Sequence, residues 1–334
     1  MTLALLAGGT TSSLPRKDTK RAMQLHENFE LMRTSKFSVI EICVKSEGVR
    51  QKQHPCSVPP NEASSSSDKK DVDSTERLDL KDTYAFEAEA TVLEILTLPC
   101  ESVAVLLNRT VFHPQGGGQP SDTGKIIVDA SGAEFEVHKV MCAGPPGHPG
   151  ALKVLHLVSP DARAGGLPAG AAVRLRVDAA KRRRHARLHS AGHLLDAAVA
   201  AVGLDLRPLK GYHFPDGPYV EYAGAVPAER RAALPAALDA ALARLVAAGG
   251  AVDVREWTPA EARAAGLDLD PALTGGDVVV RAVAMGGRAC PCEGTHVRDV
   301  GELAAAAGGG GSAVRVTKIK SKKGNTRVSY TVEE

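Results

Sequence analysis

Short apolar runs of β type recur between residues 83 and 178, and clusters of Gly and Pro separate them. Runs rich in Val, Ile and Leu and bounded by turn residues are typical of strands in a small antiparallel barrel or sandwich. The runs cover residues 91–96, 103–107, 125–128, 134–137, 153–157 and 173–177. We therefore predict that residues 83–178 form a β-barrel-like domain.

The pattern changes to a helical period after Asp178, a residue type that favours the N-cap position. Leucine and valine then recur at helical spacing, at positions 188, 195, 199 and 202. This pattern predicts a helix that runs from Ala179 towards Val202 and buries one stripe of its surface.

Residues 179–334 mix further helices with strands. Pro227 opens an Ala-rich helical stretch that reaches about Ala248, with Pro235 as an expected kink. Thr258-Pro259-Ala260-Glu261 has the form of a capping box, and Gly266 ends the short helix that follows. We expect strands at 219–222 and 278–283 and a terminal hairpin of 314–320 and 327–332. The predicted fold class is α+β: a small glycine-rich β-barrel domain followed by an α+β domain.

The N-terminal quarter offers few apolar groups to bury. Residues 45–77 read as a linker with a run of four serines, and we expect order to begin near Thr83. Residues 1–82 are therefore predicted to be a largely disordered extension. Basic residues near Ser12 and Ser13 hint at an organelle-targeting peptide, but Asp18 and nearby glutamates weaken that signal. We expect a cytoplasmic protein.

Composition narrows the class of protein. A chain of 334 residues has room for two ordinary domains and tails. No stretch approaches the roughly 20 apolar residues that a membrane span needs. The net charge of +2 means that any contact with nucleic acid must come from local basic patches. The six cysteines are scattered except for Cys290 and Cys292, which favours a reduced compartment with one metal site.

Two distant segments carry residues of the types that commonly bind zinc in proteins. His189 and His193 stand four residues apart on the predicted helix, so both imidazoles face one side. Cys292 and His296 repeat this spacing about a hundred residues later. Three imidazoles and one thiolate suffice to close a tetrahedral zinc site. We predict one Zn2+ per chain, held by these four residues.

Two other residues compete for these positions. His185 precedes His189 by four residues, but a helix rises about 12 Å over eight residues, so His185 and His193 cannot share an ion. We take His185 as the bystander, because it follows a basic run and belongs to a basic face. Cys290 is an alternative thiolate, and we favour Cys292 because its spacing to His296 suits a shared ion.

The fragments HSAGHLL and CEGTHV resemble the signature of the editing domain of alanyl-tRNA synthetases. The segment FHPQGGGQPSDTG at 112–124 resembles the glycine-rich motif of that family. The order of the two parts is similar to that of the free-standing editing proteins of the AlaX type, in their medium-length form. The resemblance covers residues 83–334. Threonyl-tRNA synthetase editing domains share the ligand spacing, but the glycine-rich motif favours the alanyl branch.

The resemblance implies a zinc-dependent aminoacyl-tRNA deacylase that removes a wrong amino acid, chiefly serine, from tRNA(Ala). Water is then the attacking group, and zinc polarises the ester, activates that water or orients the amino acid. An inactive, zinc-stabilised tRNA-binding module is the alternative. Residues 1–82 leave no room for the alanine-charging domain of a synthetase, and no ATP site or membrane partner is evident.

Three residues are candidates for catalysis. Glu293 stands where the family has Gly, and its carboxylate is either a general base or a sign of lost activity. Gln119 and Thr123 could offer hydrogen bonds to a substrate hydroxyl. The Gly116-Gly117-Gly118 run lacks the Lys-Ser/Thr of a phosphate-binding loop. We expect it to let the backbone approach the second domain or the tRNA end.

Two basic groups are candidates for contacts with the tRNA backbone. They comprise Arg182, Arg183 and Arg184 on the predicted helix and Lys318, Lys320, Lys322, Lys323 and Arg327 in the hairpin. Aromatic residues suited to base stacking are scarce, so we expect recognition by charge and shape.

Overall fold

The structure is a computed structural model that describes residues 74–98, 102–143, 152–160, 166–269, 278–305 and 311–334. Contacts divide the chain into two units, Met1–Asn61 with Leu98–Cys100, and Glu62–Thr97 with Glu101–Glu334. All elements described below lie in the second unit. The predictions of a targeting signal and of most of the linker fall outside the described residues. No helix of the described part is long and apolar enough to span a membrane.

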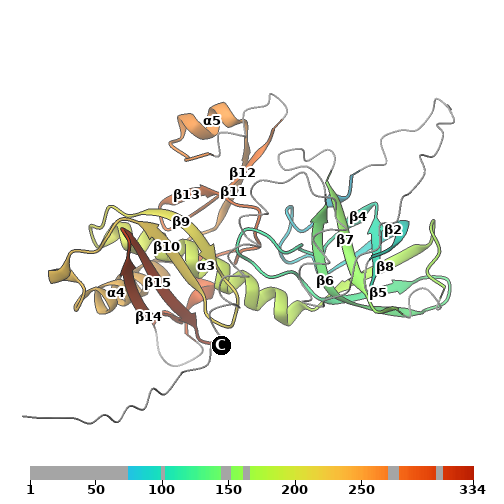
Figure 1. The fold of residues 1–334 in the computed structure, drawn as a ribbon, viewed down its shortest axis with the longest axis horizontal. Helices are drawn as coiled ribbons and strands as arrows, with labels where there is room; N and C mark the ends of the chain where they lie inside the picture. Colours follow the sequence, from blue (N-terminus) through green and yellow to red (C-terminus); the bar gives the residue numbers. More distant parts are fainter. Residues whose placement is uncertain (1–73, 99–101, 144–151, 161–165, 270–277, 306–310) are drawn as a thin grey trace, which may run out of the picture. The chain divides into compact units, whose positions relative to one another are not determined.

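A closed barrel of six strands forms the first part of this unit (Figure 1). Its strands are β2 (Glu87–Thr97), β3 (Val103–Leu107), β5 (Gly124–Val128), β6 (Glu134–Ala143), β7 (Lys153–Val158) and β8 (Ala172–Val177). They pair in the order β2-β3-β7-β6-β5-β8, and every pair is antiparallel. The six predicted runs are therefore confirmed as strands of one barrel.

Alternation of buried and exposed residues along the strands explains why the sheet closes into a barrel. In β8, Val173, Leu175 and Val177 are buried while the intervening arginines are exposed. Such alternation gives each strand one apolar face, and closing the sheet buries all of these faces without leaving an open edge. The β3 strand is buried along its whole length.

The segment just before the barrel is ordered earlier than predicted. Glu76–Arg77 forms strand β1, which pairs in parallel with β4 (Arg109–Thr110). The Arg77 guanidinium donates two hydrogen bonds of 2.7 Å to Asp79, which is fully buried. The expectation that order begins near Thr83 was wrong, because the buried ion pairs of Asp79 with Arg77 and His113, together with Leu78 packed on the barrel core, anchor this segment.

Helix α3 (Ala179–Ala201) follows β8 directly. The Asp178 carboxylate accepts a hydrogen bond from the backbone N–H of Lys181, so both the predicted helix and its N-cap are confirmed. The buried residues of α3 include Leu188, Leu195 and Val199, three of the positions in the predicted stripe.

A four-stranded sheet in the order β14-β15-β10-β9 packs against the buried side of α3, and the two share one hydrophobic core (Figure 1). Its members are β9 (Arg207–Tyr212), β10 (Tyr219–Ala223), β14 (Val314–Lys322) and β15 (Asn325–Val332). The last two form the predicted hairpin, with Lys323 and Gly324 at positive φ in the turn. Helix α4 (Leu234–Ala248) packs on α3 and on β14.

Pro235 lies in the first turn of α4 and does not kink a longer helix. The stretch from Pro227 is interrupted, because a 3-10 turn η4 (Ala228–Arg230) comes before α4. Proline is tolerated in the first helical turn, where no N–H is needed.

A three-stranded sheet carries the segment that leads to the second ligand pair. It has the order β11-β12-β13 and consists of β11 (Asp253–Trp257), β12 (Val280–Met285) and β13 (Arg288–Pro291). The short helix α5 (Pro259–Ala264) begins with the predicted capping box at Thr258. A further 3-10 turn, η5 (Val300–Leu303), follows the Cys292–His296 segment.

Candidate metal centre

Four side chains from two distant segments converge in the second part of the fold. His189 and His193 come from α3, and Cys292 and His296 from the loop after β13. One potential ligand atom from each lies within 4.8 Å of the others. The Cys292 Sγ atom is 3.5 Å from His189 Nε2 and 3.3 Å from His296 Nε2. Zinc bonds of roughly 2.3 Å to sulfur and 2.0–2.1 Å to nitrogen span donors at such separations.

The outer nitrogen of each imidazole already has a hydrogen-bond partner. His189 Nδ1 is 2.8 Å from Gln119 Oε1, His296 Nδ1 is 3.1 Å from Ser190 Oγ, and His193 Nδ1 is 2.8 Å from Cys290 Sγ. When Nδ1 donates, Nε2 keeps its lone pair for a metal, and the ring is held in a fixed orientation. The chemistry of this donor set therefore fits a divalent ion such as zinc.

Burial sets the protonation of these groups. It lowers the pKa of His193 to about 4 and holds the pKa of His189 and His296 well below the usual value. All three imidazoles are thus neutral at pH 7, as metal ligands must be. Burial also raises the pKa of the Cys292 thiol to about 11. A bound cation would favour the thiolate and oppose that rise.

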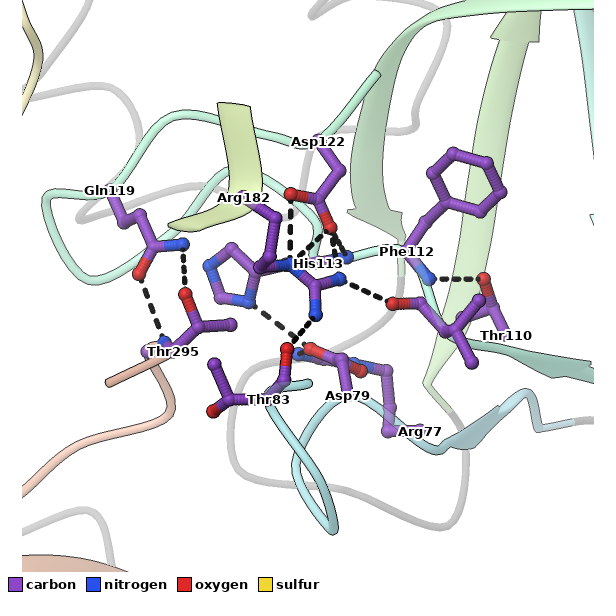
Figure 2. Close-up of polar contacts among 12 residues, drawn as sticks. Arg77, Asp79, Thr83, Thr110, Phe112, His113, Gln119, Asp122, Arg182 and Thr295 are labelled. Carbon is purple, nitrogen blue, oxygen red and sulfur yellow. Dashed lines mark hydrogen bonds and ion pairs between the residues drawn. The ribbon is translucent and has the colours of Figure 1, made fainter. Parts of the chain in front are cut away.

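Gln119 connects the glycine-rich loop of the barrel to the metal loop (Figure 2). Its Oε1 accepts from the Thr295 backbone N–H at 3.0 Å, and its Nε2 donates to Thr295 Oγ1 at 2.8 Å. Because Oε1 is an acceptor, the proton between it and His189 must sit on Nδ1. Gln119 is fully buried and its polar atoms are used. Its amide therefore positions His189 and the Thr295 backbone, and the contact with a substrate hydroxyl stays a prediction.

Glycines permit the close packing around these ligands. A Cβ at Gly118 would lie 2.4 Å from the Gly211 carbonyl oxygen, and the Gly118 oxygen accepts from the His213 N–H. A Cβ at Gly294 would lie 2.0 Å from His189 Cε1. The glycine-rich loop therefore lets the backbone approach the second part of the fold, which confirms one of the two roles expected for it.

His213 is a buried neighbour of the ligands that the sequence did not single out. Its ring stacks on His189 with the ring centroids 4.4 Å apart. Its Nδ1 lies 2.7 Å from the Tyr330 hydroxyl, which itself donates to the Leu188 carbonyl. The residue follows a strand that had no clear apolar pattern, so no sequence signal marked it.

Arg281 holds the metal loop from β12. Its Nη1 donates to the carbonyl oxygens of Cys292 and Gly294 at 2.6 and 3.2 Å, while its buried Nε has no partner among the described residues. A pocket of about 230 Å3 lies beside it, with His296 also in its wall. The rest of the lining comprises Leu80, Lys81, Asp82, Thr83, Tyr84, Val252, Val254, Val297 and Arg298.

The other catalytic candidates lie outside the cluster of metal ligands. Glu293 is exposed and does not join the four ligands, although its charge contributes to raising the Cys292 pKa. The Thr123 hydroxyl accepts a hydrogen bond from Lys181 at 3.0 Å at the start of α3. The structure therefore does not bring Thr123 together with the ligand group.

Arg182 is completely buried and so is not available to tRNA, contrary to the prediction. Its guanidinium pairs with the buried Asp122 carboxylate and donates to the carbonyl oxygens of Thr83 and Val111. His185 lies outside the ligand group as predicted, but it is 8% exposed and not on a basic face. Arg182 and His185 both lie in the first turns of α3, on the side that is buried where the helix meets the barrel, and so neither is part of an exposed basic face.

The remaining basic candidates are exposed. Arg183 stacks over the Phe86 ring, with its central carbon 4.9 Å from the ring centroid, and Arg184 pairs with Glu334 at 3.0 Å. The hairpin residues Lys318, Lys320, Lys322 and Lys323 are exposed on β14 and its turn. These side chains remain available to a polyanion.

Comparison with known proteins shows similarity to alanyl-tRNA editing proteins and alanine–tRNA ligases over part of the chain. No protein-family model matches the chain. The alanyl-tRNA editing protein AlaX-M of Methanosarcina mazei is 40% identical over 123 residues, which are 36% of this chain and 45% of that protein. The AlaX-M protein of Methanosarcina barkeri is 38% identical over 121 residues, with the same two shares. The alanine–tRNA ligase of Caldivirga maquilingensis is 32% identical over 132 residues, or 13% of its length.

The chain thus spans about half the length of the curated editing proteins that it matches. Within the aligned part, its resemblance to the alanyl-tRNA editing proteins of the AlaX type is confirmed at about 40% identity.

Proposed function

We propose that this protein is a zinc-dependent aminoacyl-tRNA deacylase that hydrolyses mischarged tRNA(Ala), chiefly Ser-tRNA(Ala). The observation that carries the proposal is the group of His189, His193, Cys292 and His296, with each imidazole oriented by its outer nitrogen. Relatives at about 40% identity are named alanyl-tRNA editing proteins, which supplies the substrate class. Residues 83–178 and 179–334 would be its barrel and editing domains, and the cytoplasm its compartment.

The pocket beside His296 is the proposed site for the aminoacyl ester. It has a volume of about 230 Å3. The Arg281 guanidinium lies in its wall and can stabilise negative charge that develops on the ester carbonyl oxygen. Because four protein ligands fill a tetrahedral site, bound zinc would orient the amino acid, or would polarise the ester or lower the pKa of a water once a fifth position opens or one ligand leaves.

Glu293 remains our candidate for a general base. Its exposed carboxylate lies in the metal loop, next to Cys292. Because it is exposed, its side chain does not crowd the buried ligands. A Glu293→Gln variant should lower the deacylation rate by about 100-fold if this carboxylate accepts a proton from water.

The test of the proposed function is release of serine from Ser-tRNA(Ala) by the full chain loaded with zinc. We expect turnover by the wild type, none after chelation, and a loss of at least about 100-fold in His193→Ala. The matched control is His185→Gln, a histidine on the same helix but outside the ligand group, which should retain most of the activity. Tight tRNA binding without turnover would contradict the proposal and favour a binding module.

A further inference from the structure

The outer face of the β14-β15-β10-β9 sheet carries chemistry that the proposed metal centre does not use. Val220, Tyr222, Val328 and Tyr330 point into the core and are at most 3% exposed. The alternate residues therefore face outward. Cross-strand pairing places them in two rows, Tyr212-Tyr219-Ser329-Lys318 and Lys210-Glu221-Arg327-Lys320.

Three aromatic rings on this face form one stacked column. The Phe214 and Tyr212 centroids lie 4.6 Å apart with an angle of 11° between the planes, and those of Tyr212 and Tyr219 lie 5.3 Å apart at 18°. The guanidinium of Arg327 caps the column 3.9 Å above the Tyr219 ring. All three rings are partly exposed, in a chain with only 4% aromatic residues.

The column ends at Phe214, just after strand β9. Tyr212 and Phe214 flank His213, which is buried and stacks on His189. Among the ring contacts of the described residues, Phe214 stacks on Tyr212 alone, so no protein ring covers its other face. A planar group can therefore extend the column past Phe214.

Basic residues outnumber acidic residues on the outer face of the sheet, which favours binding of a polyanion. Lys210, Lys318, Lys320 and Arg327 stand against one acid, Glu221, which pairs with Arg327 at 2.9 Å. Asp216 adds a second acid at the edge, where its carboxylate accepts from the Tyr212 hydroxyl at 3.1 Å. Lysines beside stacked aromatic rings are the combination that binds single-stranded nucleic acid.

We propose that the single-stranded 3′ end of an RNA lies on this face, with its terminal base stacked on Phe214 and its phosphates near the lysines. The inference rests on the proposed function for the identity of that RNA, the acceptor end of a tRNA. The low aromatic content had led us to expect recognition by charge and shape alone. The stacked column would add contacts with a base.

The test uses uncharged RNA hairpins and the zinc-loaded full chain. One hairpin has a single-stranded 3′ end with 2-aminopurine as its terminal base, and the other is blunt. We expect the wild type to bind the first more tightly and to quench the 2-aminopurine emission. Phe214→Leu should weaken binding of the first hairpin by roughly 5- to 150-fold and abolish the quench, because one base stack is lost. Binding of the blunt hairpin should not change.

Phe214→Trp and Tyr212→Phe keep the rings and should retain both tight binding and the quench. Equal losses for the two hairpins, or no loss in Phe214→Leu, would overturn the stacking site. If Phe214→Leu does not fold, an unquenched terminal 2-aminopurine on the saturated wild type overturns it equally.

The two proposals fail in different ways. Serine release by the wild type together with unchanged hairpin binding in Phe214→Leu overturns the stacking site and leaves the deacylase standing. A quench that depends on Phe214, without serine release, supports the stacking site and contradicts the deacylase.

Discussion

At the scale of single residues, the outer hydrogen bonds of the histidines matter as much as the ligand atoms. Gln119 is about 70 positions from His189 in the sequence, yet its amide fixes both that ring and the Thr295 backbone. Ser190 Oγ bonds His296 Nδ1 and also accepts from the Val297 N–H at 3.0 Å. Such partners hold a metal ligand in one tautomer and one orientation, and their loss lowers metal affinity.

Replacing Gln119 by Leu should weaken both folding and metal binding. The change leaves the Thr295 N–H, the Thr295 hydroxyl and His189 Nδ1 without their buried partner. We expect a loss of about 2–3 kcal/mol in the free energy of unfolding and a zinc affinity lower by roughly 10- to 100-fold. Chemical denaturation measures the free energy of unfolding, and competition with a metal-binding dye measures the zinc affinity. Thr123→Ala is the matched control and should change neither by more than about 0.5 kcal/mol.

His156 predicts a loss of stability in acid that is separate from the metal centre. It is fully buried in the barrel, with Nε2 2.7 Å from Thr110 Oγ1 and Nδ1 3.1 Å from the Val105 oxygen. Burial lowers its pKa from 6.5 to about 4. The unfolded chain therefore binds the extra proton first, and stability falls as the pH drops from 6.5 towards 4, by up to about 3 kcal/mol.

The measurement is the free energy of unfolding against pH in denaturant. His156→Gln keeps polar groups at the site but cannot take up the proton, so it should flatten the curve between pH 6.5 and 4. An unchanged slope in this variant would contradict the assignment.

At the scale of elements, helix α3 serves two parts of the fold at once. Its first turns carry Arg182, which bonds Asp122 of the glycine-rich loop and carbonyl oxygens next to the barrel. Two turns further on, the same helix presents His189, Ser190 and His193. A rigid helix thereby fixes the ligand pair relative to the loop that holds Gln119.

Removing the Arg182 guanidinium should destabilise the protein strongly. Arg182→Leu leaves the Asp122 carboxylate buried without a counter-charge, and both side chains are fully buried. We expect a loss of about 3–5 kcal/mol in the free energy of unfolding, measured by denaturation. Arg183→Leu, one position along and exposed, should cost less than about 1 kcal/mol. Partial recovery in the Arg182→Leu/Asp122→Leu double variant would support this reasoning, whereas additive losses would contradict it.

At the scale of the whole molecule, the proposed metal adds a bond between two distant segments that Ser190 already joins by hydrogen bonds to His296 and Val297. Its ligands come from α3 and from the loop after β13, with about a hundred residues between them. Binding free energy at such a site adds directly to folding free energy, because the unfolded chain does not present the four donors together.

Removing the metal or one ligand should therefore lower the thermal stability. Cys292→Ser should reduce bound zinc from about one per chain to well below that and lower Tm by several degrees, as chelation of the wild type should. Elemental analysis and calorimetry measure the two effects. Cys142→Ser is the matched control, since Cys142 is a free and exposed cysteine of the barrel. A full complement of zinc in Cys292→Ser would rule out Cys292 as a ligand.

Local patterns were sufficient for most of the regular structure. Short apolar runs between Gly and Pro clusters predicted the six barrel strands, and helical spacing with Asp178 as N-cap predicted α3. Strands β9, β11 and β13 were not predicted, because they are short and largely exposed and so have weak apolar patterns. The Pro235 kink was also wrong, since the position of a proline within a helix depends on where that helix begins.

The barrel strands, helix α3 and the four residues proposed as metal ligands could be predicted from the amino-acid order alone, because they depend on local periodicity and on residue type. Which polar residues are buried became visible in the folded structure. It turned Arg182 from a surface cation into half of a buried ion pair, and Gln119 into the support of His189. The physical reason is that burial and pairing are set by segments remote in the chain, which the local pattern around a residue does not record.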